Sequence, residues 1–301
     1  MTATADMIIA QRKTRRALTL WRILAIVAVV IAVIALLPRG FNKPGPHVAR
    51  ITIEGVIMDD PPRERLIRRL AENDNVEALI VEINSPGGTV TGSESLYEAI
   101  RHVAEAKPVV SVMREYAASG GYITAIAGEH IIARGNTLTG SIGVVAQVPN
   151  VEGLMEMLGV EVTRIKSAPL KAEPNFTSTP TPEALKAQEA LILDMFGWFE
   201  GLVAERRGLS GADLSEVTDG RAFTGRQALK TGLIDALGDE DTARAWLAEI
   251  HEVDADLPAR AHRWQKPKAP WPLSELENAT AALGQVDRLL SPMPRLLAII
   301  Q

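Results

Sequence analysis

Ser119 has the surroundings that covalent chemistry requires. It lies in the run 116–122, between an apolar stretch, 108–112, and a segment of small apolar residues, 123–127. This order predicts a strand, a tight turn and a helix, with the serine at the turn. A hydroxyl beside the first N–H groups of a helix could act as a nucleophile in acyl transfer, because those N–H groups stabilise negative charge. For these residues alone, a serine that caps a helix in a glycine-rich turn is the alternative.

A serine nucleophile needs a base, and two lysines of this chain are candidates. The histidines are scattered, without zinc-ligand spacing on a helix, and His130 lies in an apolar stretch that favours a structural role. Lysine accepts a proton when burial favours its neutral form, and serine–lysine pairs are a known variant of nucleophilic catalysis. Lys171 follows an expected strand at 160–165 and is the first candidate, with Lys166 as the fallback. An ordinary loop lysine is the alternative at either position.

The composition excludes several other kinds of site. The chain has 301 residues, a formal net charge of -5 and no cysteine. The lack of cysteine excludes disulfides, thiol nucleophiles and thiolate metal sites. The negative charge argues against a nucleic-acid partner, which usually requires a basic field. No motif indicates a cofactor or a metal ion, so we expect neither.

The amino-terminal segment predicts a membrane anchor. A run rich in Arg and Lys, 12–16, precedes the stretch 23–37, which contains only Ile, Leu, Ala and Val. Extending this stretch back to Leu18 gives a length that can span a bilayer, and the one arginine included can reach the interface. We therefore expect a basic cytoplasmic segment at 1–17 and a single transmembrane signal anchor at 18–37.

A cleaved signal peptide is the alternative for the same segment. The apolar stretch ends at Leu36, Leu37 and Pro38, without the small residues that signal cleavage favours. Basic flanks stay in the cytoplasm, so an uncleaved anchor would place the rest of the chain on the extracytoplasmic or periplasmic side of the plasma (inner) membrane. Residues 38–47 are rich in proline and are expected to form a linker.

Beyond the linker, short apolar strands alternate with helices. Strands are expected at 48–57, 78–83, 109–112 and 130–133, and helices at 62–72, 92–106, 181–208 and 239–250. This alternation predicts an α/β fold with largely parallel strands. The turns at Gly87–Gly88 and Ser119–Gly120 would then open on the same edge of the sheet, where the sites of α/β folds gather.

The carboxyl-terminal part has no assigned role. Residues 258–272 are proline-rich and are expected to be extended, and residues 273–301 could form an amphipathic tail. We therefore expect a catalytic domain at 48–250 and a Pro-rich and amphipathic extension at 251–301. Disorder, docking of a partner and contact with a membrane all stay open for this extension.

Five segments of the chain follow one another in a specific order. They are Asn84–Gly88, Ala117–Tyr122, Leu138–Val144, Ile165–Lys171 and Asp219–Ala228. One such motif is weak, whereas five in order behind an amino-terminal anchor are highly specific. Over residues 48–241 the chain resembles the signal peptide peptidase A family, in its short single-unit form within peptidase family S49. The resemblance implies a ClpP/crotonase-like fold, built from parallel-strand β/α units, and a serine peptidase.

Residue by residue, the resemblance implies a serine–lysine dyad. The family's nucleophile falls on Ser119, its general base on Lys171, and the serine that orients the lysine on Ser141. The N–H groups of its oxyanion hole fall on Gly120 and Gly88. The implied enzyme is a membrane-anchored serine endopeptidase that hydrolyses remnant signal peptides and other hydrophobic peptides in or near the membrane. Short-form members assemble into homo-oligomeric rings, often octamers, so we expect this chain to assemble as well.

Two other functions stay open for this fold. A crotonase-like acyl-CoA enzyme would share the fold and the glycine turns, but it has no use for a pair of Ser119 and Lys171 or for an anchor. A non-catalytic, membrane-tethered scaffold would tolerate loss of both residues, and both are present. Binding of acyl-CoA without peptide cleavage would favour the first function. Failure of a serine-directed phosphonate to label Ser119 would favour the second.

Overall fold

The computed structural model describes residues 18, 20–29 and 45–264. The chain divides after Gly45 into two compact units. In the first unit, residues 20–29 are helical and exposed. No helix formed by the described residues is long and apolar enough to cross a membrane. The predicted anchor at 18–37 lies partly outside these residues, and it stays a prediction.

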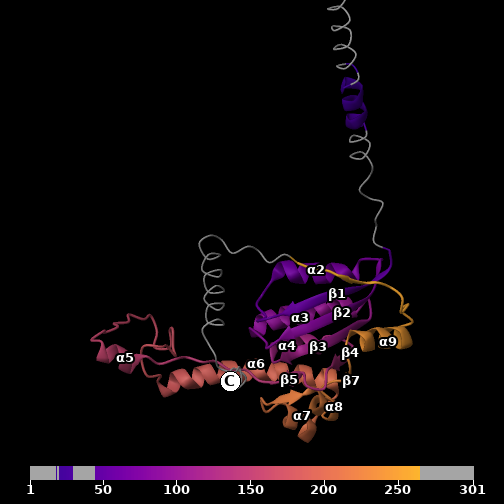
Figure 1. Ribbon diagram of the computed structural model, residues 1–301. Helices are drawn as coiled ribbons and strands as arrows, with labels where there is room; N and C mark the ends of the chain where they lie inside the picture. The colour runs from indigo at the N-terminus through magenta and orange to yellow at the C-terminus, as the bar shows by residue number, and fades with distance from the viewer. Residues whose placement is uncertain (1–17, 19, 30–44, 265–301) are drawn as a thin grey trace, which may run out of the picture. The chain divides into compact units, whose positions relative to one another are not determined.

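An eight-stranded sheet forms the centre of the second unit (Figure 1). Its long strands are parallel: β1 (His47–Glu54), β2 (Val76–Ser85) and β3 (Val109–Ala118). The shorter strands are β4 (His130–Ala133), β5 (Leu138–Gly140), β6 (Ala222–Thr224), β7 (Ala236–Leu237) and β8 (Ala259–Ala261). The main strand order is β6-β5-β3-β2-β1-β8, and among the described residues only β5 and β6 pair in antiparallel fashion. The predicted α/β fold with largely parallel strands is confirmed.

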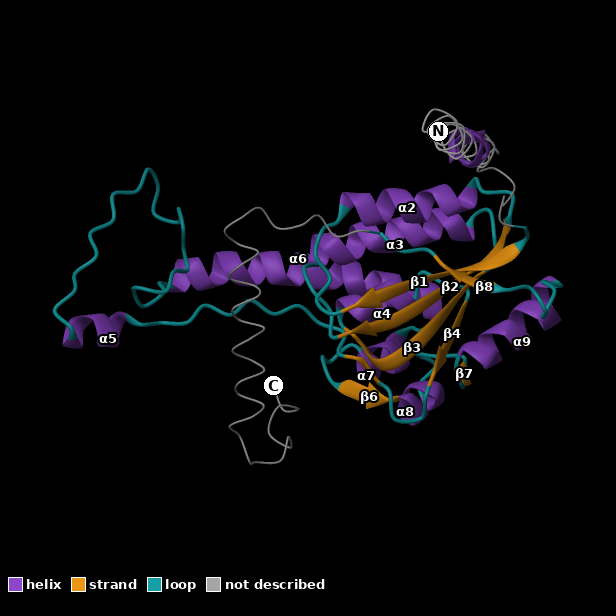
Figure 2. Ribbon diagram, turned by 45° about the horizontal axis from the view of Figure 1, so that its top comes forward, coloured by secondary structure: helices purple, strands orange, loops and turns teal. Residues whose placement is uncertain are grey.

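Helices cover both faces of this sheet (Figure 2). One face is covered by α2 (Pro61–Ala71), α3 (Val90–Ala104) and α4 (Gly120–Ala125), which share its larger hydrophobic core. On the other face, α9 (Glu240–His251) packs Ala243 and Leu247 against the sheet. Because both faces are covered, the inner strand β2 is buried along most of its length, as is typical of parallel strands.

The long helix α6 (Pro182–Arg207) begins and ends as predicted. The Thr181 hydroxyl accepts a hydrogen bond from Ala184 N at the start, and Gly208 adopts a left-handed conformation, with φ 65°, at the end. Phe199 and Val203 are buried in the larger core, so this part of α6 packs onto the domain. The remaining helices are short: α5 (Glu152–Met157), α7 (Gly211–Val217) and α8 (Gly225–Lys230).

Residues 145–181, which we name the arm, extend away from the sheet, with α5 at the far end (Figures 1 and 2). The side chains of Met157 and Ile165 are 84% and 98% exposed. The strand predicted at 160–165 is wrong, because no strand of the sheet lies beside these residues to pair with them. Apolar residues of the arm are therefore uncovered within one chain.

The last described residues add a strand at the edge of the sheet. Strand β8 pairs in parallel with β1, and His262 N donates to Arg50 O at 2.8 Å. The extended conformation predicted from residue 258 onward is confirmed over 259–261. The predicted amphipathic tail, 273–301, lies outside the described residues.

Candidate active site

Ser119 occupies the turn between β3 and α4, as the sequence predicts. Its backbone has φ 52° and ψ -120°, a conformation rare for a residue that carries a Cβ. Ser119 N donates to Gly140 O at 2.8 Å, and Ser119 O accepts from Tyr122 N at 2.8 Å. The Ser119 side chain makes no capping hydrogen bond to α4. The hydroxyl is therefore free of the structural role that a helix cap would give it.

Tyr122 fixes α4 behind this turn. Its side chain is fully buried, and its hydroxyl donates to Leu233 O at 2.8 Å. Burial raises the pKa of this phenol far above its usual range, so Tyr122 stays neutral. Because α4 is fixed in this way, it supports the Ser119 turn rigidly.

The turn after β2 lies against the Ser119 turn, and glycine makes this approach possible. Gly87 has φ 113°, and a Cβ at Gly87 would lie 3.0 Å from both Gly120 N and Ser119 Cβ. The Ser85 hydroxyl accepts a hydrogen bond from Gly87 N at 3.0 Å and holds the turn in place. The two glycine turns therefore meet at one edge of the sheet, as the sequence predicts.

Two backbone N–H groups at this junction have no protein acceptor within residues 45–264. They belong to Gly88 and Gly120, which line the same cavity as Ser119. Gly88 N lies 3.2 Å from the position that a Cβ of Gly120 would take. Two free N–H groups beside a hydroxyl can stabilise the negative charge of a tetrahedral intermediate. The structure thus brings together three of the residues predicted for the site, and their catalytic roles stay predictions.

A narrow cavity with both polar and apolar lining lies beside Ser119. Its volume is about 10 Å³, close to the least that holds one water molecule. Apart from the glycines and Ser119, its walls consist of Val90, Ser93, Ile123, Val144, Trp198 and Phe199. The spacing of the apolar residues in α6 predicts that one side of the helix is buried. It does not predict which of these residues line a cavity. The part that Trp198 and Phe199 play was therefore not predicted.

Ser141 directly follows the strand beside Ser119. In the pairing of β3 with β5, Ala118 lies opposite Gly140. Ser141 has φ 49°, and its N–H donates to Arg221 O at 2.9 Å. Ser141 itself does not line the cavity at Ser119. Ser141 lies next to the Ser119 turn, whereas Lys171, the lysine that Ser141 would orient, does not.

The two candidate lysines lie on the arm. Lys171 is exposed. Lys166 Nζ donates to Glu173 Oε1 at 2.7 Å, and this hydrogen bond lowers the pKa of the Glu173 carboxyl. Neither lysine lines the cavity at Ser119, and no other Lys, His, Asp or Glu of the described residues lines it. Within one chain, the structure brings the serine and the glycines together and leaves both lysines apart from them.

His130 has the structural role that the sequence predicts. Its ring stacks on Trp246 with the centroids 4.7 Å apart, and its Nδ1 lies 3.9 Å from Asp235 Oδ2. Burial lowers the pKa of His130 below its ordinary value, against the opposing effect of the Asp235 carboxylate. In the described part of the chain, no three or more His, Asp or Glu residues are grouped so that they could hold a metal ion.

Comparisons with known families relate this chain to peptidases. A family model described as Peptidase family S49 matches residues 101–254, and one described as Clp protease matches residues 56–137. The second match includes β2, α3, β3 and α4, and therefore both glycine turns of the candidate site. It confirms the predicted ClpP-like α/β fold for this part of the chain.

Individual relatives carry peptidase names. The protein named "Putative protease slr0021" of Synechocystis sp. is 40% identical over 211 residues, which are 69% of this chain and 76% of that protein. The protein named "Putative signal peptide peptidase SppA" of Enterococcus faecium is 29% identical over 225 residues, 70% of this chain and 65% of that protein. The chain spans 35% of "Protease 4" of Salmonella typhi, at 35% identity over 219 residues. Among solved structures, a mutant of ClpP1 from Listeria monocytogenes matches 63% of this chain and 91% of its own, with a TM-score of 0.41 and 19% identity.

Proposed function

Because the chain belongs to peptidase family S49, we propose that it is a membrane-anchored serine endopeptidase with a serine–lysine dyad. One observation carries the proposal. The Ser119 hydroxyl stands without a capping bond beside two N–H groups, of Gly88 and Gly120, that have no acceptor within residues 45–264. A nucleophile and an oxyanion site in contact are what acyl transfer to serine requires.

In the proposed mechanism, Lys171 carries one proton from Ser119 to the leaving amine. The uncharged Lys171 amine takes the proton from Ser119 Oγ, and Oγ attacks the carbonyl carbon of the peptide bond. The resulting oxyanion accepts hydrogen bonds from Gly88 N and Gly120 N, each worth about 3 kcal/mol in such sites. Lys171 then gives the proton to the leaving amine, and water hydrolyses the acyl-enzyme. Ser141 would hold the amine by a hydrogen bond.

The lysine would come from a second copy of the chain. Lys171 lies on the arm, away from the Ser119 cavity, and no other base of the described residues lines that cavity. The arm also exposes apolar side chains such as Met157 and Ile165, which a neighbouring copy would cover. A ring of copies would satisfy both conditions, because each arm could complete the site of the next chain.

The substrates of this enzyme would be remnant signal peptides and other hydrophobic peptides in or near the membrane. The small volume of the cavity at Ser119 disfavours a large side chain next to the bond that is cleaved. An anchor at 18–37 would confine the enzyme to the extracytoplasmic face of the plasma membrane. Confinement raises the effective concentration of substrates that lie in the same membrane.

Cleavage of a hydrophobic peptide by the full chain tests this function. We expect Ser119→Ala to lower turnover by at least about a thousandfold, because the covalent step loses its nucleophile. Ser215→Ala, at an exposed serine on α7, serves as the matched control and should keep wild-type turnover. Products are identified by mass. Cleavage at the wild-type rate by the Ser119→Ala protein would overturn the proposal.

A further inference from the structure

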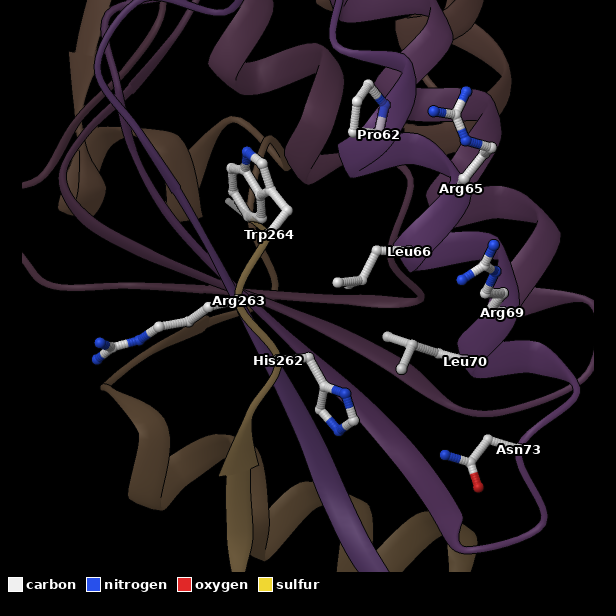
Figure 3. A pocket seen from close by; sticks show the side chains of 9 residues that line it. All are labelled: Pro62, Arg65, Leu66, Arg69, Leu70, Asn73, His262, Arg263 and Trp264. Carbon is white, nitrogen blue, oxygen red and sulfur yellow. The ribbon is translucent and has the colours of Figure 1, made fainter. Parts of the chain in front are cut away.

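A second cavity, which we name the groove, lies between α2 and residues 262–264, which follow β8. It has a volume of about 500 Å³ and is lined on one side by His262 and Trp264. Leu66 and Leu70 of α2 form the opposite side, and Figure 3 shows both leucines pointing from the helix toward the segment that carries His262. The groove is separate from the Ser119 cavity, with which it shares no residue. The apolar part of its lining consists of Pro62, Leu66, Leu70 and Trp264.

The outer margin of this groove is basic. Arg65 and Arg69, both exposed, are four residues apart and project from the same side of α2 (Figure 3). Neither has an ion-pair partner among the described residues, and no acidic residue lines the groove. By contrast, Arg68 on the same helix lies outside the groove and pairs with Glu98 at 3.6 Å. Within the described residues, no acidic side chain therefore compensates the positive charge at the margin.

Behind the groove wall, two buried hydrogen-bond donors have no acceptor among the described residues, although Arg63 itself does not line the groove. Arg63, only 5% exposed, lies over the Trp264 ring with its Cζ 5.7 Å from the ring centroid. Arg63 Nε and Trp264 Nε1 are buried, and neither has a hydrogen-bond partner among the described residues. The exposed Arg65 and Arg69, in a groove whose described lining holds no carboxylate, suit an anionic ligand.

The chain enters the domain beside this groove. His262, on the groove wall, has its Nε2 3.1 Å from Nε2 of His47, the first residue of β1. The two rings are stacked with centroids 5.3 Å apart. The first strand of the domain, which follows the predicted linker at 38–47 in the sequence, therefore begins beside this groove. An anionic group on a membrane surface is a ligand that this position favours.

We propose that the groove binds an anionic phospholipid, with its phosphate on Arg65 and Arg69 and the apolar part of the lipid against Leu66, Leu70 and Trp264. The arginine forks match phosphate oxygens, and the apolar part of the lining gives a lipid contacts that free phosphate lacks. This inference rests on the membrane anchoring in the proposed function, and it does not depend on the catalytic dyad. Lipid in the groove would hold the domain on the membrane where its substrates lie.

Lipid binding to the full chain in a neutral detergent tests the inference. The bound fraction is measured by native mass spectrometry with dihexanoyl phosphatidylglycerol, dihexanoyl phosphatidylcholine and inorganic phosphate as probes. We expect a preference for phosphatidylglycerol, and about tenfold weaker binding by the double variant Arg65→Gln, Arg69→Gln, which loses two charge-assisted hydrogen bonds. Arg68→Gln removes one charge from the same helix and should bind as the wild type does.

Three results would overturn the inference: equal binding by the double variant and the wild type, equal loss in Arg68→Gln, or displacement of the lipid by an equal concentration of inorganic phosphate. Peptide cleavage by the same samples separates the two proposals. The double variant should cleave a soluble peptide at the wild-type rate, because the groove shares no residue with the Ser119 cavity. A wild-type protein that binds the lipid as expected and cleaves nothing would support the lipid site and refute the proposed peptidase.

Discussion

At the scale of single residues, Ser119 is held in a backbone conformation that costs stability. A side chain at φ 52° and ψ -120° is strained by about 1–3 kcal/mol. The conformation persists because Ser119 N is bonded to Gly140 O and because the glycine turn of Gly87 packs against it. Strain that the surroundings maintain in this way is typical of a residue positioned for chemistry.

Gly88 is the residue whose substitution tests the oxyanion site. A Cβ at Gly88 would lie 2.6 Å from Ile57 N and would also meet the Ile57 carbonyl, so the turn must shift. We expect Gly88→Ala to lower kcat by at least about a hundredfold, because one N–H donor leaves its position. We also expect overpacking to lower the free energy of unfolding by about 1–3 kcal/mol. Peptide turnover and chemical denaturation measure the two effects.

Gly201 provides the matched control for this substitution. It lies in α6, and a Cβ there would meet nothing within 4 Å. Gly201→Ala should leave turnover unchanged and raise the free energy of unfolding by up to about 1 kcal/mol, because alanine favours a helix. Wild-type turnover by the Gly88→Ala protein would argue against a donor at that position.

Trp198 is the residue that we expect to limit substrate size. Its side chain closes one wall of the cavity at Ser119. Trp198→Ala should open this wall, so that cleavage after large apolar residues increases relative to cleavage after small ones. A peptide mixture analysed by mass spectrometry gives the ratio of cleavage after large apolar residues to cleavage after small ones. A ratio equal to that of the wild type would mean that other residues limit substrate size.

At the scale of secondary-structure elements, strong local patterns predicted the parts that build the nucleophile turn. The apolar run before Ser119 and the glycines after it predicted β3 and α4, and the cap at Thr181 predicted the start of α6. The strand at 160–165 was wrong, because a strand needs a partner that a local pattern does not reveal. Likewise, the local sequence placed Lys171 in a loop, but it could not show whether another chain packs against this lysine.

The contact between β4 and α9 makes stability depend on pH. Burial lowers the pKa of His130 in the folded chain, so at pH values below about 6.5 the unfolded chain binds more protons at this residue. We therefore expect the free energy of unfolding to fall as the pH is lowered from about 7 to about 5. In His130→Gln this fall should be smaller, since the glutamine does not titrate.

Denaturation of both proteins across this range measures the effect. At about pH 8, His130 is neutral in both the folded and the unfolded chain, so the difference between the two proteins there reports only packing on Trp246. An equally steep fall in His130→Gln and the wild type would mean that other groups carry the pH dependence.

At the scale of the whole molecule, one chain brings together only part of the proposed site. The fold supplies the serine and two N–H donors at one sheet edge, whereas Lys171 lies on an arm that leaves the domain. The exposed apolar residues of that arm indicate a partner surface outside the chain. The resemblance of a single sequence assigns both residues of the proposed dyad, but it does not show from which copy of the chain each one comes.

Coexpression of the Ser119→Ala and Lys171→Ala chains tests the central claim most directly. Each variant alone should be inactive, and Lys166→Ala should stay active as the matched control. If the serine and the lysine of each site come from different chains, randomly mixed assemblies should recover about one quarter of the wild-type turnover. Mixed assemblies, verified by mass to contain both variants, that cleave no peptide would contradict a dyad of Ser119 and Lys171 shared between copies.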